Sequence, residues 1–158
     1  MSGNEPAASL SPRTRARAER VRVGIVQWQM REYGSRDALL RHALHFIDTL
    51  ADTGAQLALL PEFFSVPLLA PAGSVAPRAA MEALADETPA LVDALGARAV
   101  ARGVWIVAGS LPLREGTQLL NSAFVLGPAG QREVQHKLHV TPGEHAQWGI
   151  TGGDGLRV

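Results

Sequence analysis

The sequence has 158 residues, no cysteine, and a single lysine, Lys137, beside fourteen arginines. The lack of cysteine excludes disulfides, thiolate metal ligands and a cysteine nucleophile from this chain. Fifteen basic residues balance fifteen acidic ones, so the formal net charge of zero argues against binding nucleic acid through bulk charge. No run of about 18 apolar residues is present, so neither a membrane-spanning helix nor a membrane partner is expected.

The first 20 residues differ in composition from the rest of the sequence. Residues 1–20 mix Gly, Pro, Ala, Ser and Arg without an apolar run. This composition is typical of a solvated, disordered leader and lacks the core of a secretory signal peptide, although its arginines leave a basic or targeting arm as the alternative. We therefore expect a cytoplasmic protein, and a length near 150 residues predicts one domain.

From Val21 onward, short apolar runs alternate with segments of helical periodicity. The predicted strands span 21–28, 56–60, 104–109, 119–126 and 131–139. The predicted helices span 36–53, 79–85 and 88–102. Ser35 is expected to cap the first helix and Thr88 the last, and residues 127–130 form a hairpin turn. This order predicts an α/β fold whose mixed sheet is covered on both faces, and residues 155–158 resemble the opening of another strand.

Glu62 is the first candidate for chemistry, because it directly follows a predicted buried strand in the run LLPEFF (59–64). In open α/β sheets, ligands bind at the carboxyl ends of strands. A carboxylate that Leu and Phe partly desolvate there suits a general base. The alternative is a loop glutamate that points to solvent, and position alone favours neither.

Lys137 and Glu144 form a second candidate group. Lys137 lies late in the last predicted strand, where alternation places it on one face with Gln135 and His139. A lone lysine among arginines marks a position that needs a compact ammonium, although a solvated strand face is the alternative. Glu144 follows a Thr-Pro-Gly turn and could stabilise the charge of Lys137, or it could be an ordinary loop charge.

Metal and cofactor chemistry has little support in the sequence. Three histidines, His136, His139 and His145, cluster within ten residues, but their spacing fits no zinc signature and alternation points His136 away from His139. No dinucleotide fingerprint, phosphate-binding loop or G-x-S-x-G elbow is present. We expect no metal and no cofactor.

Five stretches resemble, in family order, the N-terminal part of the nitrilase superfamily, the carbon–nitrogen hydrolases. They are VRVGIVQWQM (21–30), AQLALLPEFFS (55–65), VWIVAGSLP (104–112), LNSAFVLGPAG (120–130) and KLHVTPGE (137–144). The resemblance implies a nitrilase-like α-β-β-α sandwich, of which residues 21–158 would be an incomplete, truncated N-terminal part behind the 1–20 leader.

The resemblance also implies a Glu–Lys–Cys triad that hydrolyses a small amide or nitrile. Glu62 would match the general base, Lys137 the lysine that stabilises the oxyanion, and Glu144 a further acid that supports the site. The family cysteine would lie on a strand beyond Val158, so we expect this chain alone to be inactive and a full-length form to be a homo-oligomer. The alternative is a non-catalytic α/β binding or interaction module.

Overall fold

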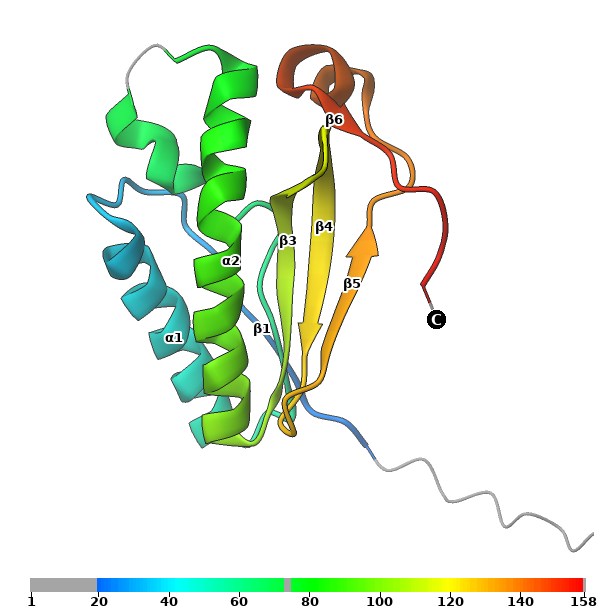
Figure 1. Cartoon of the computed structure of the whole chain (residues 1–158). Coiled ribbons are helices and arrows are strands. Elements are labelled where there is room, and N and C mark those ends of the chain that lie inside the picture. Colours follow the sequence, from blue (N-terminus) through cyan, green and yellow to red (C-terminus); the bar gives the residue numbers. More distant parts are fainter. Residues whose placement is uncertain (1–19, 73–74, 158) are drawn as a thin grey trace, which may run out of the picture.

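The computed structural model describes residues 20–72 and 75–157 as a six-stranded mixed sheet with helices (Figure 1). The strands are β1 (Val23–Ile25), β2 (Leu57–Leu59), β3 (Trp105–Glu115), β4 (Gln118–Leu126), β5 (Arg132–His136) and β6 (Ile150–Thr151). The helical segments are α1 (Arg36–Asp52), the 3₁₀ segment η1 (Val66–Ala72), α2 (Pro77–Arg102) and the π-helical η2 (Glu144–Trp148). The predicted α/β fold is confirmed, whereas the predicted leader lies outside the described residues except for Arg20.

The sheet runs in the order β1-β2-β3-β4-β5, and β6 pairs with β4. The first three strands are parallel, and β4 is antiparallel to both β3 and β5. The two crossovers through α1 and α2 step in the same direction along the sheet, which places both helices on the same face (Figure 1). No helix within residues 20–72 and 75–157 has the length and apolar character needed to cross a membrane.

The main core lies between the sheet and this pair of helices. It is formed by fully buried apolar side chains of α1, α2 and the central strands, among them Leu39, Ile47, Leu91, Leu95 and Ile106. The predicted cap of α1 is confirmed, because the Ser35 side chain accepts a hydrogen bond from the backbone N–H of Ala38 at 3.2 Å. The helix predicted at 36–53 is also confirmed, and it buries one face against the sheet.

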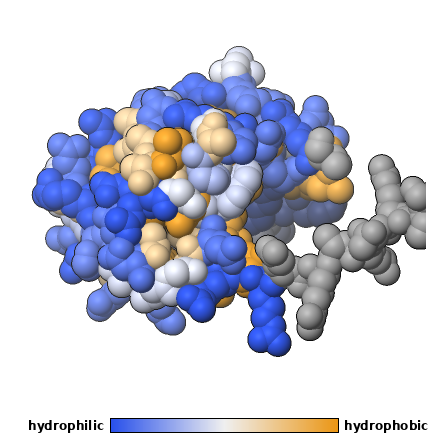
Figure 2. Space-filling model, turned by 90° about the horizontal axis from the view of Figure 1, so that it is seen from below, coloured by the Kyte–Doolittle hydropathy of each residue, from blue (hydrophilic) through white to orange (hydrophobic). Residues whose placement is uncertain are grey.

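The opposite face of the sheet carries apolar side chains that no described helix covers. Val23, Ile25 and Trp105 are 47%, 71% and 37% exposed. Figure 2, a view from below toward one end of the molecule, likewise shows apolar patches among hydrophilic ones. The expectation of a sheet covered on both faces is therefore wrong for the described residues. Apolar side chains on both faces of the strands suggested a layer of helices on each face of the sheet, but the crossover helices α1 and α2 cover only one face.

We expect this chain, prepared by itself, to self-associate through the open sheet face. An exposed apolar sheet face favours contacts between molecules. Sedimentation velocity at micromolar concentrations should show oligomers that Ile25→Lys reduces. Val100→Lys is the matched control, because Val100 is an exposed apolar residue (52%) of α2, away from the sheet. A monodisperse wild-type monomer would contradict the prediction.

One continuous helix, α2, replaces the two helices predicted at 79–85 and 88–102. Pro89 lies inside it, where its missing N–H would ordinarily end a helix. Thr88 is therefore not an N-cap: it is buried, and its hydroxyl donates to the carbonyl of Pro112 in β3 at 2.6 Å. Packing of the buried face of α2 against the sheet maintains the helix through the proline.

Strand lengths also differ from the sequence pattern. β3 extends to Glu115 although it contains Pro112, a residue that disfavours an internal strand position. β5 ends at His136, so Lys137 follows the strand instead of lying within it. Residues 155–157 are not a strand, and Val158 lies outside the described residues. The predicted turn at 127–130 is confirmed, because Gly127 N–H donates to the carbonyl of Gln131 at 2.8 Å.

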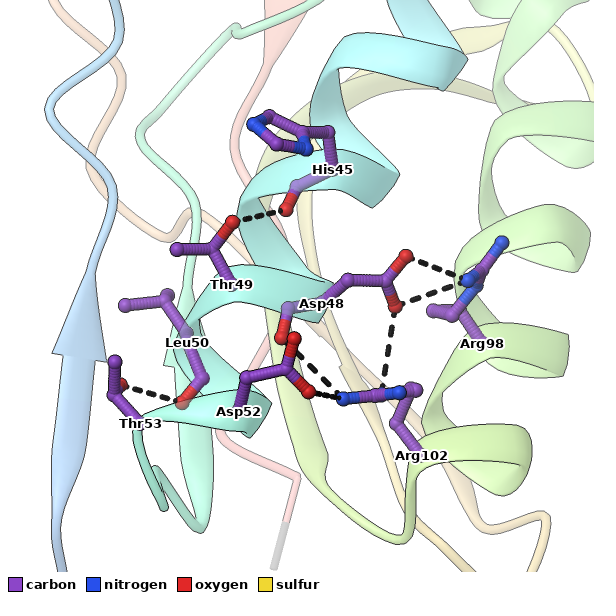
Figure 3. Close-up of polar contacts among 8 residues, drawn as sticks. All are labelled: His45, Asp48, Thr49, Leu50, Asp52, Thr53, Arg98 and Arg102. Atoms are coloured by element: carbon purple, nitrogen blue, oxygen red, sulfur yellow. Dashed lines mark hydrogen bonds and ion pairs between the residues drawn. The ribbon is translucent and has the colours of Figure 1, made fainter.

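A group of ion pairs joins α1 to α2 near their C-terminal ends (Figure 3). Asp48 accepts hydrogen bonds from Arg98 at 2.7 and 2.9 Å, and Arg102 Nε lies 3.5 Å from the same carboxylate. Arg102 also pairs with Asp52. These side chains are about one-third exposed or more, so each pair contributes about 1 kcal/mol at most and mainly fixes how the two helices face each other.

Candidate active site

Glu62, Lys137 and Glu144 lie together, although 75 residues separate the first two. Lys137 Nζ is 3.3 Å from Glu62 Oε1, 2.9 Å from Glu144 Oε1 and 3.0 Å from Glu144 Oε2. Glu62 follows β2, Lys137 follows β5, and Glu144 begins η2. The fold thus brings all three predicted site residues into one cluster in which an ammonium bridges two carboxylates.

The backbone around Glu62 is held tightly against β3. Phe63 N–H donates to the carbonyl of Ser110 at 2.8 Å, and Phe63 has a φ of 52°, in the left-handed region. Gly109, beside this segment, has a φ of 57°, and a Cβ there would lie 1.9 Å from the Pro61 carbonyl oxygen. Only glycine permits this close approach, which sets the position of Glu62 at the strand end.

The exposure of Glu62 decides between the two alternatives that its position in the sequence leaves open. The flanking Phe63 and Phe64 point into the core, but the Glu62 side chain itself is 55% exposed. Of the two alternatives left open for Glu62, this exposure is closer to a loop glutamate in contact with solvent than to a carboxylate that Leu and Phe desolvate. The physical reason is the open sheet face, because Glu62 lines the cavity on that side and keeps contact with solvent.

Glu144 is the buried member of the cluster, at 5% exposure. Its carboxylate Oε2 accepts a hydrogen bond from Thr141 N–H at 2.7 Å, and Thr141 Oγ1 accepts one from Glu144 N–H at 3.2 Å. This reciprocal pair is a capping box, which holds the glutamate side chain in place. Burial acts to raise the pKa of Glu144, but the Thr141 N–H and the Lys137 ammonium outweigh it and lower the pKa.

Lys137 is correspondingly held as a cation. The hydrogen bond to Glu144 raises the pKa of Lys137, burial opposes this, and Glu62 raises the pKa further. Its side chain is 31% exposed, so the ammonium is accessible while both carboxylates restrain it. At neutral pH, the cluster therefore presents a fixed N–H donor next to a carboxylate that can accept a proton.

A cavity of about 380 Å³ opens beside the cluster on the uncovered side of the sheet. Its lining includes apolar side chains of the central strands together with polar groups from the cluster: Leu59, Val107, Ala123, Glu62, Asn121 and Lys137. This volume suits a small molecule, and an apolar wall with a few convergent polar groups is typical of ligand sites.

Asn121 is a member of the cluster that the sequence analysis missed. It is 1% exposed, and its Nδ2 donates to Glu62 Oε1 at 2.8 Å and to Glu144 Oε1 at 3.4 Å. Its backbone carbonyl accepts a hydrogen bond from Lys137 N–H at 2.8 Å. The available signal was an amide in the mostly apolar run LLNSAF (119–124), because a buried polar side chain needs partners.

The three clustered histidines do not converge. His136 is buried, with Nδ1 at 2.9 Å from Ser122 Oγ and Nε2 at 3.4 Å from Glu115 Oε1. His145 Nδ1 lies 3.2 Å from the carbonyl oxygen of Ile150, and His139 is exposed. Within the part of the chain that the structure describes, no three His, Asp or Glu side chains are grouped to hold a metal.

The fold and the acid–lysine cluster define an α/β protein with a charged candidate active site beside a small-molecule cavity. Residues 22–151 match the family model of the carbon-nitrogen hydrolases, and the chain belongs to that family. A curated relative, the probable hydrolase YhcX of Bacillus subtilis (strain 168), is 29% identical over 138 residues, which cover 87% of this chain and 27% of the relative.

Solved structures show the same fold. The carbon-nitrogen hydrolase of Helicobacter pylori G27 matches with a TM-score of 0.68 at 20% identity, covering 85% of this chain and 45% of that one. Nit3 of Saccharomyces cerevisiae gives 0.67 at 17%, with 85% and 49% covered. An amidase from Nesterenkonia sp. gives 0.63 at 25%, with 89% and 51% covered. The chain thus spans about half the length of these structures.

Proposed function

We propose that this chain supplies the general base and the oxyanion-stabilising lysine of a hydrolase that cleaves the C–N bond of a small amide or nitrile. The observation that carries the proposal is the Lys137 ammonium, held between Glu62 and Glu144 at the edge of a small-molecule cavity. Similarity to a Nesterenkonia amidase favours the same class of reaction. A cytoplasmic location and homo-oligomeric assembly remain predictions.

In the proposed reaction of an amide, Glu62 accepts the proton of a cysteine thiol as the sulfur attacks the carbonyl carbon. Lys137 donates a hydrogen bond to the oxygen that becomes negative in the tetrahedral intermediate. The C–N bond then breaks, and the nitrogen takes the proton from Glu62 and leaves as ammonia or an amine. Water attacks the thioester with Glu62 again as base, which releases the acid and restores the thiol.

The thiol would come from outside this sequence, which contains no cysteine. We therefore expect no ammonia release from small amides or nitriles by this chain alone, and turnover by a longer gene product that continues into a cysteine-bearing strand. An ammonia assay over a panel of short amides and nitriles, with sequencing of the DNA downstream of the Val158 codon, tests this. An acyl adduct on this chain by mass spectrometry, or inactivity of the longer product over the whole panel, would refute it.

The absence of cysteine also favours a second candidate, a non-catalytic binding module that keeps the cavity and the charged cluster. This candidate predicts a stop codon directly after Val158 with no cysteine-bearing continuation. It also predicts saturable binding of a small amide to this chain, measured by calorimetry, without release of ammonia.

A further inference from the structure

We propose that Asn121 is a positioning residue that bridges the two carboxylates and orients Glu62 for proton transfer. The role rests on the proposed function, because it concerns how Glu62 and Lys137 are presented to a substrate. It assigns a task to a buried side chain that donates hydrogen bonds to both carboxylates of the cluster.

Asn121 and Lys137 each link Glu62 with Glu144. Two like charges in one site repel each other, so each carboxylate needs donors that hold it in place. Lys137 Nζ contacts both carboxylates, and so does Asn121 Nδ2, at 2.8 Å from Glu62 and 3.4 Å from Glu144. An Asn amide nitrogen carries two N–H groups, one for each carboxylate.

The orientation of the Asn121 amide is set by these contacts. Turning the amide over would place Oδ1 against two carboxylate oxygens, which are acceptors only. In the orientation that donates to them, Oδ1 is buried and has no hydrogen-bond partner among the residues that the structure describes. A buried acceptor without a partner is costly, so the side chain gives up that interaction in order to donate to the acidic pair.

A neutral donor is also the chemically suitable one for this position. A second cation beside Glu62 would stabilise the negative charge of the carboxylate further than Lys137 already does, and would so weaken it as a base. The Asn121 amide fixes Glu62 Oε1 by a hydrogen bond without adding a full positive charge. The other oxygen of Glu62 is then left free to take a proton, since 55% of the side chain remains exposed.

The backbone couples this amide to the lysine. Asn121 lies in β4 one residue before Ser122, which pairs with His136 of β5, and the Lys137 N–H continues the ladder to the Asn121 carbonyl at 2.8 Å. The amide and the ammonium are thereby fixed relative to each other by strand pairing. Loss of the amide side chain should let Glu62 move away from the Lys137 ammonium, while the backbone hydrogen bonds between β4 and β5 stay in place.

The single lysine of this chain makes the proposal measurable. Labelling with ¹³C-lysine yields one side-chain signal, and its titration reports the pKa of Lys137 directly. We expect Asn121→Leu to lower the pKa of Lys137, because Glu62 is no longer held beside the ammonium. Asn121→Ala, which adds no bulk, should give the same decrease and serves where the leucine variant does not fold.

Ser122→Ala is the matched control. Ser122 is the fully buried neighbour in β4, and its hydroxyl contacts His136 on the other side of the strand. It should reduce stability without changing the Lys137 titration. If the Asn121 variants shift the pKa of Lys137 no more than Ser122→Ala does, the positioning role is refuted. In an active longer product, Asn121→Leu should lower kcat more than it changes KM. The titration needs no turnover, so absence of hydrolysis would count against the proposed function alone.

Discussion

Replacing Lys137 by arginine is expected to lower amide turnover, in a hydrolytically active protein that contains this chain, by about 10²–10³-fold. This is the loss measured when one donor to an oxyanion is removed. Arginine keeps the positive charge, but its guanidinium is planar and wide, whereas Lys137 Nζ occupies a single point 2.9–3.3 Å from both carboxylates. The guanidinium of arginine cannot keep the contacts to both carboxylates and also direct an N–H to the substrate oxygen that becomes negative.

Steady-state kinetics would separate this effect from weaker binding. A donor that acts only on the developing negative charge should affect kcat and leave KM nearly unchanged. The reverse exchange, Arg132→Lys, is the control, because Arg132 pairs with Asp93 at 2.6 Å on the surface and is half exposed. Turnover by Lys137→Arg within a few fold of wild type would remove Lys137 from the proposed mechanism.

The parts of the site that could be predicted depend on local signals. Glu62 comes three residues after the last residue of the short apolar strand β2, so its place at a strand end was visible in the run LLPEFF. Lys137 and Glu144 are seven residues apart and meet through one turn. The capping box between Thr141 and Glu144 is likewise a local pattern, T-x-x-E, that can be read from the sequence.

The parts that could not be predicted depend on pairing between distant segments. Asn121 joins the cluster because β4 and β5 pair in one register, and a shift by one residue would point its amide to the other face. The continuity of α2 through Pro89 depends on packing against β3. Helix propensities, which depend on local residues alone, do not include such packing. The exposure of Glu62 depends on what covers the second sheet face, a property of the whole fold.

Glu144→Gln is expected to destabilise the fold by about 2 kcal/mol near neutral pH, the range for a hydrogen bond to a charged group. Glutamine has nearly the same shape, so the cavity and the packing around η2 should be unchanged. What disappears is the negative charge that accepts from the Thr141 N–H and from the Lys137 ammonium, in a side chain that is only 6% exposed. Urea unfolding monitored by tryptophan fluorescence would measure the difference.

The pH dependence of this difference gives the stricter test. The pKa of Glu144 is lowered in the folded state, so its stabilisation is complete above its ordinary pKa of about 4.3 and is lost as pH falls through the lower, folded value. The pKa of Lys137 is raised, so its stabilisation is complete below its ordinary pKa of about 10.4 and is lost as pH rises through the higher, folded value.

The wild type and Glu144→Gln should therefore differ most between about pH 5 and pH 10, and the two should converge in acid as Glu144 takes up a proton. Glu82→Gln is the matched control, because Glu82 pairs with Arg78 at 3.0 Å on the exposed side of α2. That exchange should cost less than about 1 kcal/mol at any pH. A difference for Glu144→Gln that stays constant from pH 3 to pH 8 would show that its carboxylate carries no charge-dependent stabilisation.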